Sequence, residues 1–203
     1  MKSNYIELLR EYGASANKVK NLWDEIYVNY SKSNRHYYNL NHLENLYSEL
    51  STVKNQITNW NVILFTLYYH DIIYTSTKKD NEERSAELAS KRMSEIGISE
   101  IEVKQCYEQI IATKDHKESP SADANYFLDA DLSILGNEPK TYKKYFGNIR
   151  KEYSIYPKFI YNKGRKKVIN QFLKMNRIFK TEEFYLKYEF KAKFILENEL
   201  KTL

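Results

Sequence analysis

Residues 62–74 form an almost wholly apolar run, V-I-L-F-T-L-Y-Y-H-D-I-I-Y, and two ionisable side chains, His70 and Asp71, stand near its end. A segment that is apolar on every side is expected to be buried. A carboxylate, however, is almost never fully buried unless it is paired or binds a metal. The fold must therefore bring partners to His70 and Asp71, and the chain has only three other histidines, His36, His42 and His116.

The scarcity of helix-breaking residues predicts an all-α fold. Only five Gly and three Pro occur in 203 residues, and no segment alternates convincingly as a strand. This length fits one sizeable core, so we expect a single-domain helical bundle over residues 1–203. The apolar periodicity predicts helices at 15–30, 40–54, 59–74, 82–96, 99–114, 122–136, 138–153, 165–176 and 181–201.

The charge balance permits a polyanionic partner without requiring one. The net charge is +5, and the 32 basic residues are interspersed with 27 acidic ones. Small phosphorylated molecules fit this balance, whereas no recognisable motif favours nucleic acid. The single Cys106 excludes an intrachain disulfide, the N-terminal residues lack the apolar core of a signal peptide, and residues 62–74 are too few to span a bilayer. We expect a cytoplasmic protein with no membrane partner.

Two aspartates in F-L-D-A-D-L-S-I-L-G supply a further carboxylate. Asp129 and Asp131 lie about 200° apart on a helix of 3.6 residues per turn, so only one is expected to face the core. Asp131 lies in an apolar stripe with Phe127, Leu128 and Leu135, whereas Asp129 falls on a mixed surface. We therefore predict that Asp131 is the inward carboxylate.

A divalent metal would satisfy these groups together, because inward carboxylates and a histidine on separate helices otherwise repel or stay unsatisfied. His42 lies 28 residues before His70, a separation that fits two adjacent antiparallel helices. His36 competes with it, and the six-residue offset places the two imidazoles on opposite sides of one helix, so at most one is a ligand. Mixed nitrogen and oxygen ligands suit one iron, manganese, nickel, cobalt, zinc or magnesium ion better than calcium.

The order His42, His70-Asp71 and Asp131 resembles the HD-domain superfamily of metal-dependent phosphohydrolases, whose signature is H…HD…D on an all-α bundle. The chain is most similar to a bacterial subfamily of predicted metal-dependent HD phosphohydrolases, from about residue 20 to the C-terminus. The similarity is carried by R-H-Y-Y-N-L-N-H (35–42), H-D-I-I-Y (70–74), N-E-E-R-S-A (81–86), F-L-D-A-D-L-S-I-L-G (127–136), I-R-K-E-Y (149–153) and G-R-K-K-V (164–168).

The resemblance implies metal ligands at His42, His70, Asp71 and Asp131. It also implies hydrolysis of a phosphoester in a nucleotide or another small phosphorylated metabolite by a metal-activated water. The competing interpretation is a non-catalytic metal- or nucleotide-binding module that recruits a partner through its basic face. Substrate identity, the type of phosphoester and the oligomeric state are left open by the sequence.

The candidate catalytic residues are Glu82, Asp129 and His116. Some HD nucleotidases carry a helper glutamate three residues after the HD aspartate, and Tyr74 stands there in this chain. Glu82 is then the leading candidate for proton transfer, although it also suits the positive end of a helix dipole. Asp129 either orients a ligand from behind or, if the helix phase differs, binds metal itself. His116 is either a phosphate contact, a second-metal ligand or an exposed cation at a helix end.

The candidate substrate-binding residues lie mostly near His42. We expect Arg35 and His36 in the loop that precedes the His42 helix, close to the substrate phosphate, and Tyr37 and Tyr74 along the pocket. Arg165, beside Gly164, is either part of a solvated basic face or grips a phosphate with both guanidinium nitrogens.

Overall fold

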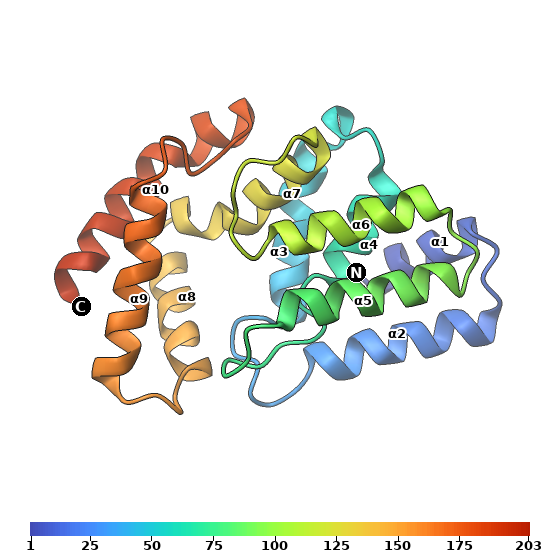
Figure 1. Ribbon diagram of the computed structural model, residues 1–203, viewed down its shortest axis with the longest axis horizontal. Coiled ribbons are helices and arrows are strands. Elements are labelled where there is room, and N and C mark those ends of the chain that lie inside the picture. Colours follow the sequence, from blue (N-terminus) through green and yellow to red (C-terminus); the bar gives the residue numbers. More distant parts are fainter. The chain divides into compact units, whose positions relative to one another are not determined.

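The computed structural model describes residues 1–203 and confirms the all-α fold, with ten α-helices, two short 3₁₀ helices and no strand (Figure 1). The chain forms two compact units, Met1–Phe127 and Leu128–Leu203, and the boundary falls inside helix α7. No helix is long and apolar enough to cross a membrane. The expectation of a single domain stays a prediction.

The first unit is built around helix α4 (Trp60–Tyr69), in which every side chain from Val62 to Tyr69 is buried. This confirms the burial predicted from the apolar run. Helix α4 packs against four helices of its unit (Figure 1), namely α1 (Lys2–Glu11), α3 (Leu40–Thr52), α5 (Asn81–Ser94) and α6 (Glu100–Ala112). The unit also contains α2 (Ala16–Tyr30), the 3₁₀ helix η1 (Lys54–Gln56) and the first half of α7 (Ala122–Leu132).

Two side chains fix the beginning of α4. Asn59 accepts a hydrogen bond from the Val62 N–H at 3.1 Å, as an N-cap residue does. The buried carboxylate of Asp123, on α7, accepts hydrogen bonds from the N–H groups of Thr58 and Asn59, both at 2.8 Å. This long-range contact was not predicted from the sequence, and it ties α7 to the start of the central helix.

Helix α4 ends at Tyr69, five residues earlier than the predicted end at residue 74. The prediction was wrong because side chains from α5 bind the backbone that follows. The Ile73 N–H donates to Ser85 Oγ at 3.1 Å, and the Thr75 N–H donates to Asn81 Oδ1 at 3.1 Å. These tertiary contacts replace the helical hydrogen bonds that the apolar composition alone would have continued.

Other helix boundaries were also predicted imperfectly. Helix α1 was not predicted, and the helix expected at 122–136 is divided into α7 and the 3₁₀ helix η2 (Ser133–Gly136). Helix α9 (Lys158–Leu173) begins directly after Pro157, seven residues before its predicted start. Gly164 lies inside it, so this glycine does not mark a helix end.

The second unit packs α8 (Pro139–Glu152), α9 and α10 (Glu182–Thr202) with η2. Helix α10 lies so close to η2 that a Cβ atom on Gly136 would be 2.7 Å from the Tyr188 carbonyl oxygen. Glycine is therefore required at this approach. The buried Arg165 of α9 is bonded to the buried Glu199 of α10, which links these two helices in the unit interior.

We predict that Asp123→Ala lowers the free energy of unfolding by about 1–2 kcal/mol, the cost of a lost helix cap, because the N–H groups of Thr58 and Asn59 lose their acceptor. Urea denaturation followed by circular dichroism measures the change. Asp115→Ala removes an exposed carboxylate and is the matched control, expected to stay within about 0.5 kcal/mol of wild type. Equal losses in the two variants would contradict a capping role for Asp123.

Candidate metal centre

Two buried histidines face each other at the ends of neighbouring helices. His42 lies in the first turn of α3, and His70 is the residue at which α4 ends. Their Nε2 atoms are 3.2 Å apart, and the side chains are 4% and 1% exposed. The pairing that was predicted from the 28-residue separation of the two histidines is therefore present in the fold.

The hydrogen bond at the other nitrogen of His70 fixes its ring. His70 Nδ1 is 3.0 Å from the Leu67 carbonyl oxygen. A carbonyl oxygen only accepts, so Nδ1 carries the proton and donates to it, and Nε2 of the neutral ring keeps its lone pair. That lone pair points toward the His42 ring. A backbone acceptor at the second ring nitrogen is also the arrangement that orients histidines which bind metals.

The carboxylate of Asp71 joins the two imidazoles. Its Oδ2 atom is 3.1 Å from His70 Nε2 and 3.7 Å from His42 Nε2. Atoms that carry lone pairs thus converge on a small volume from which most water is excluded. Either a proton on the His42 ring nitrogen or a bound metal ion can satisfy such a set, because unshared lone pairs and negative charge repel one another.

Asp131 offers a further possible metal ligand beside the two histidines. Phe127, on α7, packs its ring against that of His70 with centroids 5.4 Å apart, and Asp131 follows one helical turn later on the same side of α7. His42, His70 and Asp131 each offer one ligand atom, and these atoms lie within 4.8 Å of one another. The three residues could hold a metal ion, and the chemistry of the donors fits one.

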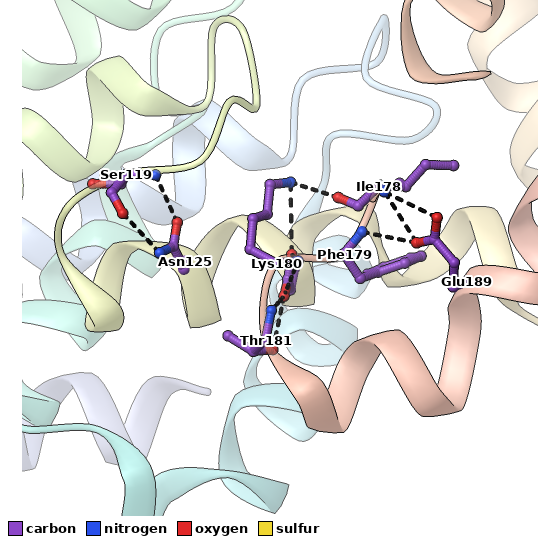
Figure 2. Close-up of polar contacts among 8 residues, drawn as sticks. Ser119, Asn125, Ile178, Phe179, Lys180, Thr181 and Glu189 are labelled. Carbon is purple, nitrogen blue, oxygen red and sulfur yellow. Dashed lines mark hydrogen bonds and ion pairs between the residues drawn. The ribbon is translucent and has the colours of Figure 1, made fainter. Parts of the chain in front are cut away.

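Asp129 lies in the interior of the second unit, and the prediction that it falls on a mixed surface was wrong. Its side chain is 0% exposed, and its carboxylate accepts hydrogen bonds from the backbone N–H groups of Lys180 and Thr181 at 2.7–2.9 Å and from the Thr181 hydroxyl at 2.7 Å. Figure 2 shows Lys180 and Thr181 together with Ile178 and Phe179, whose N–H groups donate to the buried Glu189.

Asp129 and Asp131 therefore lie on opposite sides of α7. Asp129 is bonded to the segment before α10, and Asp131 lies beside the two histidines. Burial raises the pKa of Asp129, while the Thr181 and Lys180 donors oppose that shift. Both oxygens accept hydrogen bonds from the segment that leads into α10, so this carboxylate holds that segment in place. Helical periodicity identified opposite sides correctly, but it could not reveal that residues 178–181 cover the second side.

Arg165 was expected either on a solvated basic face or as a phosphate contact, and the structure instead buries it with its donors bonded to protein groups. Nε and one terminal nitrogen bond the Glu199 carboxylate at 2.7 and 2.9 Å, and the terminal nitrogens also donate to the hydroxyls of Tyr142 and Tyr145. The side chain is buried in the second unit. This arginine stabilises the packing of α8, α9 and α10, and the prediction of a substrate contact is withdrawn.

Arg35 also differs from its predicted role as a phosphate contact. It is buried, and its guanidinium donates to the backbone carbonyls of Tyr38, Asp71 and Ile72. His36, the next residue, is exposed on the loop before α3 and is not part of the converging group. His42 and not His36 is therefore the histidine that meets His70.

Three half-buried tyrosines lie beside the cluster. The Tyr37 and Tyr38 rings have centroids 4.9 and 5.7 Å from that of His42, and the Tyr74 ring lies 4.4 Å from that of Tyr38. Tyr37 and Tyr74 were predicted to line the site, and the structure places both next to it. Tyr38 was missed, although it stands in the same R-H-Y-Y-N-L-N-H block.

Glu82 and His116 remain candidates with different surroundings. Burial raises the pKa of Glu82, its own backbone N–H opposes this, and the negative charge of Asp71 raises the pKa further. The half-buried Glu82 side chain lies in the first turn of α5, close enough to Asp71 for the charge of Asp71 to affect its pKa. His116 follows α6 with a left-handed φ of 50° and is not among the three residues that could share a metal ion.

Comparisons of this chain with protein-family models, with curated proteins and with solved structures found no match. The resemblance to the HD superfamily therefore stays a prediction that rests on the sequence blocks. The convergence of His42, His70 and Asp71 is an independent ground for a functional hypothesis.

The isosteric substitutions Asp129→Asn and Asp131→Asn are expected to separate folding from metal binding. Asp129→Asn should lower the free energy of unfolding by about 2–4 kcal/mol, because a charged acceptor of several buried donors becomes a neutral amide. Asp131→Asn should lower stability less than Asp129→Asn does, and it should weaken metal binding. Urea denaturation and calorimetric titration with Mn²⁺ measure the two quantities. A reversed pattern would show that the roles of the two aspartates are exchanged.

Proposed function

We propose that the protein is a metal-dependent phosphohydrolase that acts on a small phosphorylated metabolite. The observation that carries this proposal is the convergence of His42 Nε2, His70 Nε2 and Asp71 Oδ2, separated by 3.1–3.7 Å inside a mostly buried site. The order of these residues and of Asp131 along the chain agrees with the H…HD…D signature that the sequence resembles.

The ligands of one divalent ion would be His42, His70, Asp71 and Asp131. Two imidazoles and two carboxylates suit iron, manganese, cobalt, nickel or zinc, with magnesium favoured less by the nitrogen ligands. A divalent ion in such a set lowers the pKa of a bound water toward about 7 and polarises a phosphoryl oxygen. These are the two requirements for attack of water on a phosphoester.

The protein's own groups orient and enclose this site. The Leu67 carbonyl holds the His70 ring with Nε2 directed inward, as the 3.0 Å contact to Nδ1 requires. The aromatic rings of Tyr37 and Tyr38 cover His42 and limit access of water from that side. Exclusion of water strengthens the interaction between the ligands and any charge that enters the site.

Glu82 is the proposed proton-transfer residue. A carboxyl group whose pKa is raised by burial can hold a proton closer to neutral pH than an exposed glutamate can. The next residue, Glu83, differs sharply, because a hydrogen bond from Lys114 lowers its pKa. The sequence does not distinguish the two glutamates, and the difference comes from their surroundings.

The substrate class is proposed from what surrounds the site. Arg35 and Arg165 donate to protein groups, so we assign neither to the phosphate. The exposed His36 remains a cationic candidate at the edge of the site, and the half-buried rings of Tyr37 and Tyr74 offer flat surfaces to a nucleotide or another phosphorylated metabolite. Nucleic acid as the main ligand is not proposed.

The decisive experiment compares wild type with Asp71→Ala. Protein stripped with EDTA should hydrolyse p-nitrophenyl phosphate or one member of a nucleotide panel only after Mn²⁺, Co²⁺, Fe²⁺, Ni²⁺, Zn²⁺ or Mg²⁺ is restored. Loss of Asp71 should weaken metal binding more than about 100-fold, beyond the cost of losing a supporting residue, and should abolish turnover.

Asp24→Asn, which alters an exposed carboxylate on α2, is the matched control and should behave as wild type. An Asp71→Ala protein with full metal content and full turnover would contradict the site. Metal binding by wild type without any turnover would instead favour a non-catalytic metal- or nucleotide-binding module.

A neighbouring pair of glutamates tests the proton-transfer step. Glu82→Gln should lower kcat by about 10²- to 10⁴-fold, the contribution of a positioned acid or base, while Mn²⁺ affinity stays near wild type. Glu83→Gln removes a carboxylate that is bonded to Lys114 and should leave kcat within about twofold of wild type. Steady-state kinetics at saturating metal measures both. Comparable losses in the two variants would show that Glu82 has no special role.

A further inference from the structure

Arg35 is a buried cation that the proposed chemistry does not use. Its side chain is 6% exposed, although it lies on the loop between α2 and α3. Burying a guanidinium is costly unless its N–H groups are bonded, so its partners indicate what it is for. The rings of Tyr30 and Tyr74 lie 4.8 and 5.8 Å from its Cζ atom, which is a distance that favours cation–π attraction.

The guanidinium bonds the backbone that directly follows His70. One terminal nitrogen donates to the Asp71 carbonyl at 2.7 Å, and the other donates to the Ile72 carbonyl at 2.8 Å. Both carbonyls lie just beyond His70, the C-cap of α4, where a cation is favoured by the helix dipole. No glycine follows α4 directly, and the guanidinium instead holds the non-helical backbone that comes after it.

The same guanidinium also bonds the segment that leads into α3. The nitrogen that contacts Asp71 donates to the Tyr38 carbonyl at 3.1 Å, four residues before His42. Asn39 caps α3 by accepting from the Asn41 N–H at 3.0 Å, so this segment is continuous with an ordered helix start. One planar group therefore joins the approach to His42 with the backbone of Asp71 and Ile72, which directly follows His70.

We propose that Arg35 is a positioning residue of the metal centre, which holds the Asp71–Ile72 backbone so that His70 and Asp71 face His42. This inference rests on the metal-binding part of the proposed function. Lysine cannot replace Arg35, because its single ammonium group lacks the planar fork that reaches three carbonyl oxygens in two segments. Arg35 does not touch substrate in this role.

The test titrates the full chain with Co²⁺ and follows visible absorption, which reports both affinity and ligand geometry. Arg35→Lys and Arg35→Met should bind Co²⁺ about 10- to 100-fold more weakly than wild type and with an altered spectrum. Arg92→Lys is the control, because Arg92 also joins two helices of the first unit, through Glu25, and has no contact with the cluster. It should keep the wild-type affinity and spectrum at a comparable melting temperature.

Each outcome decides the inference. Wild-type Co²⁺ affinity and spectrum in the Arg35 variants would overturn it and leave the proposed metal centre standing. An equal loss in Arg92→Lys, or failure of both Arg35 variants to fold, would assign Arg35 to general stability and overturn it too. A wild-type protein that binds no Co²⁺ would overturn the metal centre together with this inference. Metal binding without phosphoester turnover would remove only the hydrolase proposal.

Discussion

The burial of α4 is the constraint on which the first unit depends. Its side chains from Val62 to Tyr69 are all buried, so the helix must be surrounded, and its end must lie inside the protein. His70 and Asp71 come directly after that end. The imidazole of His70 and the carboxylate of Asp71 therefore lie in a mostly buried environment, where each needs a partner. The approach of His42 to 3.2 Å from His70 satisfies this need and creates the candidate metal centre.

The ends of α4 are held by side chains from distant parts of the chain. Asp123 bonds the backbone before the helix, and Arg35 bonds the backbone after it. Both are charged, buried residues whose partners are backbone groups, so their contribution is to position and not to neutralise another side chain. A site that is defined to a fraction of an ångström requires such support, because ligands on free loops lose affinity through disorder.

The pair Asp129 and Asp131 shows how one short block serves two purposes. Asp131 offers an oxygen to the group that could hold a metal ion, whereas Asp129 bonds the backbone of Lys180 and Thr181. Their two-residue spacing places them on opposite sides of α7, so the same turn of helix can meet both requirements. The residue type alone does not decide which carboxylate has which role, since both are aspartates on one helix.

The sequence by itself determined the all-α class, the burial of residues 62–70 and the pairing of His42 with His70, because composition, apolar periodicity and spacing act locally along the chain. Only the tertiary structure decided where α4 ends, which carboxylate anchors α10, and that Arg35 and Arg165 bond protein groups. Each of these depends on a partner far away in sequence: Ser85 for Ile73, Thr181 for Asp129, Glu199 for Arg165. Hydrogen bonds of this kind leave no periodic trace, since a buried polar group is defined by what the fold brings to it.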